Sequence, residues 1–216
     1  MQPDRQTLRI IGRRSSLFTR VPLMFAEALG VGIELDPVRD MTRLAPQDYA
    51  GNPALKLPIL RVGDDALFGS VNICRAIADR AAADGRTHRV VWPENLTGML
   101  AANAHEMVAH CMAAQVQLVM GTQLGSLPAD APFFVKIRTG MEGALQWLDS
   151  HLDEMLARLP PERTLSLFEV SLFCLLEHLA FRATVSSDGY SRLSRFATAY
   201  GLRPAAKATS YRYDDP

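Results

Sequence analysis

The chain has 216 residues, of which 48% are hydrophobic, and its 23 basic residues balance its 23 acidic ones. This length and apolar content suffice for a well-buried core in one or two domains, and a net charge of zero argues against nucleic acid or an anionic membrane as the main partner. We expect neither a signal peptide nor a membrane span. The first residues are polar and charged, and the longest apolar stretch, residues 165–181, includes Glu169, Glu177 and His178 and predicts a buried helix.

The three cysteines of the chain are Cys74, Cys111 and Cys174, and each lies within a helical pattern. An odd number of cysteines without paired spacing argues against a disulfide framework. The cysteines therefore predict reduced thiols, packed as small hydrophobic side chains, in a cytoplasmic protein.

The first part of the chain, residues 1–83, predicts a small α/β domain. Because proline is tolerated only in the first turn of a helix, Pro22 indicates that the first helix begins near Phe18 or Thr19. Short apolar runs predict strands, and apolar residues at helical spacing predict helices. The expected order is strand 7–12, helix 17–29, strand 33–38, a loop or irregular helix over 42–55, strands 59–62 and 66–68, and a helix from Ser70. This order is the thioredoxin-like arrangement.

A β-hairpin is predicted near the end of this domain. Gly63-Asp64-Asp65 is a turn signal between two short apolar runs. Pro58 stands at the start of the first run, where a missing N–H is tolerated, and its bond to Leu57 is a candidate for the cis form. Ser70 follows the second run and is a good N-cap for the next helix.

The rest of the chain predicts a linker, residues 84–95, and an all-helical domain, residues 96–216. The linker has no apolar periodicity. Ser166 and Glu169 fit a helix-capping box, in which a serine caps the helix and an acidic residue holds the third helical position. The expected helices are 96–122, 133–158, 166–183 and 189–200.

The sequence around His105, Glu106 and His110 is similar to the zinc motif HExxH, in which two histidines flank a glutamate. That motif places its histidines four residues apart on one helix face. Here they are five residues apart, about 140° around a helix. No metal site is predicted.

The hairpin region resembles the second half of the glutathione-binding domain of glutathione transferases. The family pattern of Asn-Pro, Lys-Val-Pro-x-Leu, Gly, Leu and Ser-x-x-Ile is matched over more than twenty positions. Leu57 replaces the usual valine, and Gly69 replaces the acidic or amide residue before the serine. The matching residues are Asn52, Pro53, Lys56, Leu57, Pro58, Leu60, Gly63, Leu67, Ser70 and Ile73.

A second resemblance lies where the first helix begins. Ser15, Arg20 and Val21 match the Ser-x-x-x-x-Arg-Val signature of serine-type glutathione transferases. The doublet Ser15-Ser16 is similar to the zeta-class signature associated with maleylacetoacetate isomerases, although leucine and proline replace its cysteine and second arginine. The alternative is that both serines are only helix caps or loop residues.

The resemblance implies a thioredoxin-like domain joined to an all-helical domain, with glutathione as co-substrate and no metal. It assigns thiolate stabilisation to Ser15, Ser16 and Arg20, and it places the γ-glutamyl carboxylate at the helix N-terminus of Ser70. It also implies that the Leu57 backbone pairs with the cysteinyl part of glutathione, next to a cis Pro58. The glutathione-binding residues implied are Lys56, Leu57, Pro58, Gly69 and Ser70.

The expected function is a glutathione transferase that activates the thiolate of glutathione for attack on a small apolar molecule. Candidates for the electrophile site, in a cleft between the domains, are His105, His110, Cys111 and Gln115. Two alternatives stay open: a glutathione-dependent isomerase, and a non-catalytic protein of the same fold that binds a ligand or partner. The resemblance also implies a homodimer.

Overall fold

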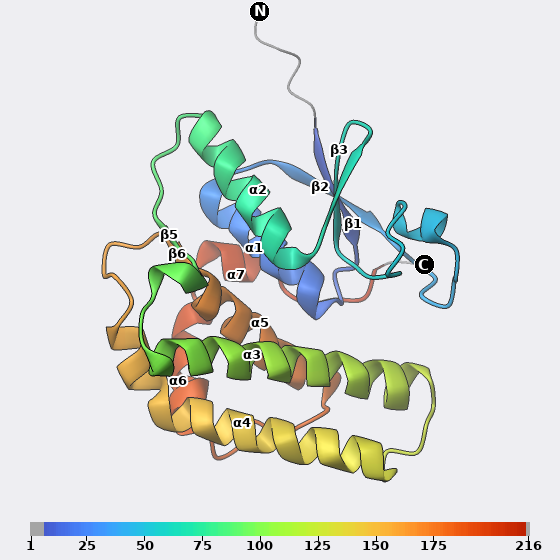
Figure 1. The fold of residues 1–216 in the computed structure, drawn as a ribbon, viewed down its shortest axis with the longest axis vertical. Helices are drawn as coiled ribbons and strands as arrows, with labels where there is room; N and C mark the ends of the chain where they lie inside the picture. Colours follow the sequence, from blue (N-terminus) through green and yellow to red (C-terminus); the bar gives the residue numbers. More distant parts are fainter. Residues whose placement is uncertain (1–6, 215–216) are drawn as a thin grey trace, which may run out of the picture. The chain divides into compact units, whose positions relative to one another are not determined.

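The computed structural model describes residues 7–214 and divides into two compact units. The first comprises residues 7–88 together with 204–214, and the second is Arg89–Arg203. The sequence places the whole of 96–216 in one helical domain, whereas residues 204–214 belong with the first unit. Figure 1 follows the chain by colour from blue to red.

The first unit is built on a four-stranded mixed sheet with strand order β2-β1-β3-β4. β1 pairs with β2 in parallel and with β3 antiparallel, and β3 and β4 form the predicted hairpin. Two helices, α1 and α2, pack against each other and lie on one face of the sheet (Figure 1). The bounds are β1 Leu8–Gly12, α1 Leu17–Leu29, β2 Ile33–Pro37, β3 Ile59–Val62, β4 Asp65–Phe68 and α2 Ser70–Ala83. The thioredoxin-like order predicted from the sequence is confirmed.

The core of this unit lies between the sheet and the two helices. Leu8 and Ile10 of β1 are buried, and Arg9 between them is exposed. This alternation is what a strand with one covered face requires. The helices contribute buried residues at helical spacing, namely Val21, Met24 and Phe25 from α1 and Ile73, Cys74 and Ile77 from α2.

The loop between β2 and β3 contains one short 3-10 helix, η1 (Pro46–Tyr49), where the sequence predicts a loop or irregular helix. The Tyr49 side chain is buried, and its hydroxyl donates to the carbonyl of Met41. The Asn52 amide donates to the carbonyl of Lys56 at 2.9 Å, and its side-chain oxygen accepts from the N–H of Ala54. The Asn-Pro motif therefore shapes the loop that leads into β3.

The second unit is helical. α3 (Met99–Leu118) packs against α4 (Pro132–Ala157) and α5 (Leu167–Arg182), and α6 (Ser191–Gly201) packs against α4 and α5. The four predicted helices are therefore found. The helix expected over 96–122 is α-helical only as far as Leu118, and a π-helical segment, η3 (Val119–Leu124), follows it directly. No helix among the described residues is both long enough and apolar enough to cross a membrane.

The predicted linker contains short regular structure. β5 (Val90–Val91) pairs in parallel with β6 (Leu165–Ser166), and a 3-10 helix, η2 (Pro93–Asn95), follows β5. A two-residue strand is too short to give a periodic sequence signal. The pairing depends on the second half of the unit and could not be read from residues 84–95 alone.

Candidate functional site

Three separate segments meet at one end of the strands β1, β3 and β4 in the first unit. In the strand register, Ile59 lies opposite both Ile11 of β1 and Phe68 of β4. Residues that follow β1, precede β3 and follow β4 must therefore lie side by side, because neighbouring strands are about 5 Å apart. The predicted glutathione-binding residues 57–58 and 69–70 are thus brought together next to the loop that leads from β1 to α1.

The residue before β3, Leu57, presents an unused stretch of backbone. Its peptide bond to Pro58 is cis, as the predicted pairing with a peptide requires. Among the described residues, Leu57 forms no hydrogen bond through its N–H or its carbonyl. A backbone donor and acceptor left open at the end of a strand can pair with an extended peptide. Lys56, beside it, is exposed.

The N-terminus of α2 is also open. Its N-cap is Gly69 and not Ser70 as predicted, and no side chain caps the helix. Within the described chain, no acceptor is found for the N–H groups of Ser70, Val71 and Asn72. Unpaired N–H groups at the start of a 14-residue helix attract a carboxylate or another anion.

Glycine at position 69 has a conformational reason. Its φ is 88° and its ψ is 136°, a region that side chains with a Cβ rarely adopt. The acidic or amide residue of the family pattern would be strained in this backbone. Gly69, which departs from the glutathione transferase pattern, therefore suits the backbone conformation at this position.

The hydroxyl of Ser70 has a structural partner that explains the proline in α1. α1 begins at Leu17, so Pro22 lies in its second turn and not in the first as predicted. Proline has no N–H for the carbonyl four residues earlier, which belongs to Phe18. Ser70 Oγ donates to this carbonyl at 2.8 Å. The serine replaces the missing helix hydrogen bond and ties α2 to α1 from the first helical position, which follows the N-cap Gly69.

The two serines before α1 differ in their surroundings. Ser16 is the N-cap of α1, and its Oγ accepts from the N–H of Thr19 at 3.3 Å. Ser15 has 2% of its surface exposed. The loop runs close to the helix, since a Cβ on Gly12 would come within 2.6 Å of the Thr19 side chain. Ser16 therefore caps the helix, and Ser15 remains the candidate hydroxyl for a thiolate.

Arg20 is buried, with 2% of its surface exposed. It donates to the carbonyl of Ala206 at 3.1 Å and to the hydroxyl of Thr209 at 3.4 Å, and its guanidinium lies 4.3 Å from the ring centre of Tyr211. These contacts hold α7 (Pro204–Ala208) and the residues after it against α1. No local sequence pattern indicates these contacts, because Ala206 and Thr209 lie 186 and 189 positions from Arg20. The structure thus gives Arg20 an anchoring position.

Two of the predicted electrophile-site residues lie in the interior of the second unit. Gln115 has no exposed surface, and its amide contacts His178 Nδ1 at 2.9 Å and accepts from the Thr184 hydroxyl at 2.6 Å. Cys111 is buried, and burial raises the pKa of its thiol to about 12. Contrary to the sequence prediction, neither side chain is accessible to a ligand in this structure. The partners His178 and Thr184 are separated from Gln115 by more than 60 positions, which hides the network in the sequence.

The two histidines of α3 differ from one another. His110 is exposed and lies 3.1 Å from Glu106, one helical turn away. The ring of His105 packs edge-on against Phe168 at 5.5 Å, and its Nε2 is buried without a hydrogen-bond partner in the described part of the chain. Burial lowers the pKa of His105, and the carboxylate of Glu94 acts weakly in the opposite direction.

The depressed pKa of His105 makes the stability of the second unit depend on pH. The unfolded chain binds the proton near the ordinary pKa of about 6.5, whereas the folded chain binds it only at lower pH. The free energy of unfolding should therefore fall as the pH drops below 6.5, and His105→Gln should flatten this dependence. Urea titrations between pH 7.5 and pH 5 measure the slope. His110→Gln is the control; an equal loss of slope there would contradict the role of His105.

The predicted cap of α5 is confirmed, with a different partner for its acidic residue. Ser166 is the N-cap and accepts from the N–H of Glu169. The carboxylate of Glu169 does not return to the Ser166 backbone. Both of its oxygens accept from Arg163, at 2.6 Å each. The pair raises the pKa of Arg163 further above its ordinary value.

Among residues 7–214, no group of three or more histidine, cysteine, aspartate or glutamate side chains is placed to hold a metal ion. The candidate site in the first unit consists instead of backbone groups and hydroxyls: the open backbone of Leu57, the N-terminus of α2 and the Ser15 hydroxyl. Such groups can bind a carboxylate and an extended peptide, and can stabilise a negative charge.

No protein-family model and no curated protein matches the sequence. Solved structures do match its fold. A glutathione S-transferase from Methylobacillus flagellatus, solved with glutathione bound, is 19% identical, covers 95% of this chain and 100% of its own, and has a TM-score of 0.71. Gtt2 from Saccharomyces cerevisiae is 13% identical over 93% of this chain and 99% of its own, with a TM-score of 0.69.

Glutathione transferase F7 from Populus trichocarpa is 19% identical, with 94% of this chain and 97% of its own covered and a TM-score of 0.67. All three similarities extend over nearly the full length of both chains. The sequence resemblance to glutathione transferases covers only residues 13–21 and 52–73, whereas the similarity of the backbone fold covers nearly the whole chain. The chain has the glutathione S-transferase fold, a thioredoxin-like N-terminal domain joined to an all-helical C-terminal domain.

Proposed function

We propose that the protein binds glutathione in the first unit and activates its thiol for attack on a small apolar electrophile. The observation that carries this proposal is the open backbone of Leu57 beside the open N-terminus of α2. A tripeptide with a free carboxylate at one end meets both requirements, since its peptide groups pair with the strand end while its carboxylate lies at the helix N-terminus.

Ser15 supplies the chemistry in this proposal. A free thiol has a pKa of about 8.5, so only a few per cent is ionised at pH 7. Lowering that pKa by about two units requires roughly 2.7 kcal/mol of differential stabilisation. A hydroxyl donor at the start of a helix can provide a large part of it. The reacting nucleophile is the thiolate of glutathione, and the protein contributes binding and electrostatics.

Ser15→Ala should raise the pKa of the bound thiol by about one to two units and lower the rate of conjugation at pH 7 by roughly 10- to 100-fold. Its affinity for glutathione should change little, because the carboxylate and the peptide groups are held elsewhere. Thiolate absorbance as a function of pH measures the first effect, and isothermal titration measures the affinity. A Ser15→Ala protein with an unchanged thiol pKa would contradict the assignment.

Ser70→Ala tests the binding half of the same proposal. The substitution removes the donor to the Phe18 carbonyl and should loosen the α2 N-terminus that receives the carboxylate. We expect the native protein to bind glutathione with a dissociation constant in the micromolar to low-millimolar range. The Ser70→Ala variant should bind it more weakly. Absence of heat and of thermal stabilisation at about 10 mM glutathione would reject glutathione as the ligand.

One observation favours a second candidate function. With 2% of its surface exposed, Ser15 is accessible to a thiol only if its surroundings move. A protein of this fold that binds glutathione without activating it would fit this burial. The two functions differ in thiolate absorbance, which a non-catalytic binder would lack at neutral pH. A cytoplasmic homodimer remains part of the main proposal, and sedimentation analysis tests the dimer.

A further inference from the structure

The segment 204–214 brings a carboxylate to the candidate thiolate site. Both oxygens of Asp214 accept from the N–H of Arg14, at 3.3 and 3.2 Å, and one of them lies 4.0 Å from Arg13 Nε. Arg14 directly precedes Ser15, so the carboxylate is bound at the backbone N–H of the residue next to the candidate hydroxyl.

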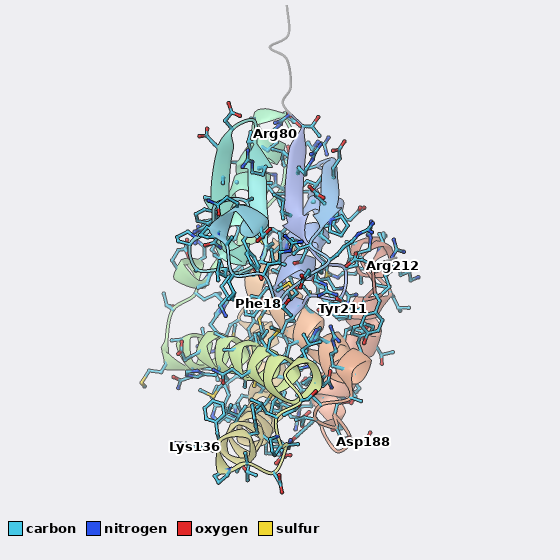
Figure 2. All side chains as sticks on the ribbon, turned by 90° about the vertical axis from the view of Figure 1, so that its right-hand side faces the viewer. Phe18, Arg80, Lys136, Asp188, Tyr211 and Arg212 are labelled. Carbon is cyan, nitrogen blue, oxygen red and sulfur yellow. The ribbon has the colours of Figure 1, made fainter. Side chains whose placement is uncertain are left out.

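This carboxylate is held in place by an anchored segment. Arg20, one turn into α1, binds Ala206, Thr209 and Tyr211. Figure 1 shows the red segment running past the first turn of α1, and Figure 2 shows Tyr211 and Phe18 near the same end of the unit. The side chain of Asp214 is itself only 10% exposed. Its position is thus set by several contacts from two elements.

Within the described residues 13–20 and 204–214, Asp214 is the one acidic residue; Asp215, which follows it, lies outside the described residues. Residues 13–20 and 204–214 otherwise carry cations alone: Arg13, Arg14, Arg20, Lys207 and Arg212. A group of cations at the start of a helix favours an anion, whereas a carboxylate in the same place disfavours a second negative charge.

We propose that Asp214 sets the acidity of a thiol bound at Ser15, by holding a competing negative charge at the amide of Arg14. This inference rests on the proposed function. In the native protein the thiolate has to form beside an existing carboxylate, so its pKa is higher than Ser15 and the helix alone would make it. Asp214 is a positioning residue, since it acts on the site through the Arg14 amide and through its field.

Asp214→Asn separates charge from hydrogen bonding. The amide oxygen of asparagine can still accept from the Arg14 N–H, while the negative charge is lost. We expect the pKa of glutathione bound to the variant to fall by about half a unit to one unit, which gives roughly three to ten times more thiolate at a pH below both values. Glutathione should also bind more tightly to the variant at a pH above the lowered pKa, because more of the bound ligand is then thiolate. The measurement is thiolate absorbance against pH on the full chain with bound glutathione.

Asp64→Asn is the matched control, because Asp64 is an exposed residue of the β3–β4 turn in the same unit. It should leave the thiol pKa unchanged, and thermal unfolding confirms that both variants are folded. A thiol pKa in Asp214→Asn equal to the native value would overturn the role of Asp214 while leaving the proposed function intact. A protein that binds no glutathione in any form would instead contradict the proposed function.

Discussion

Glu169→Gln should destabilise the second unit by about 3 kcal/mol, because it removes one partner of a buried ion pair. Glu169 has 3% of its surface exposed and receives two hydrogen bonds from Arg163, whose side chain is 16% exposed. Removing one partner of a buried ion pair leaves the other charge without compensation. Glutamine retains the shape but loses the charge and turns an amide N–H₂ toward the guanidinium.

Urea denaturation followed by tryptophan fluorescence measures this effect well. Both tryptophans of the chain, Trp92 and Trp147, lie in the second unit, so the signal reports the unit that contains the pair. Glu154→Gln is the control. Its pair with Arg158 spans 2.8 Å but is exposed, and should contribute less than about 0.5 kcal/mol.

A double variant tests whether the cost is specific to the pair. Replacing both Arg163 and Glu169 by methionine removes the two buried charges together, and such replacements are often close to neutral. We expect the double variant to be more stable than Glu169→Gln. If Glu169→Gln unfolds at the same urea concentration as the native protein, the ion pair does not stabilise the unit.

Arg20→Met should loosen the segment 204–214 and destabilise the first unit by about 2 kcal/mol. The substitution removes the donors to the Ala206 carbonyl and the Thr209 hydroxyl, and with them the cation over Tyr211. A buried carbonyl left without a donor costs about 1–3 kcal/mol, and a desolvated cation–π contact adds to this. Methionine keeps the buried volume, so the loss reflects the polar contacts.

Hydrogen exchange with peptide-level resolution measures the Arg20 effect where it arises, because the first unit contains no tryptophan. Amides of residues 204–214 should exchange faster in the variant than in the native protein. Arg9→Met is the control, since Arg9 forms an exposed pair with Glu34. Unchanged exchange together with lost conjugation activity would instead place Arg20 among the catalytic residues, as the family signature implies.

Glu169 and Arg20 show what a sequence pattern can predict and what only the tertiary structure reveals. The Ser-x-x-Glu spacing located the cap of α5 correctly, because a cap is a local contact between a hydroxyl and an N–H three residues later. The partner of Glu169 was not found, since an arginine six residues earlier matches no local pattern. Arg20 was recognised by its place in a signature, but its neighbours come from residues 206–211.

Pro22 and Ser70 are a second example. The sequence rule for proline predicted that α1 begins later than it does, because the rule assumes that a missing helix hydrogen bond stays missing. A hydroxyl 48 positions away replaces it. Likewise, helical periodicity found α3, but could not tell whether Gln115 faces a cleft or an interior lined by His178 and Thr184.

By itself, the sequence determined the order of strands and helices in the first unit, the four main helices of the second and the cap of α5. These depend on apolar spacing, turn residues and contacts within a few positions, all of which are local. The tertiary structure decided which hydroxyls and charges are already engaged: Ser70 with Phe18, Arg20 with the 204–214 segment, and Asp214 with Arg14. Such pairings depend on how distant segments pack, and that packing is set by burial over the whole unit.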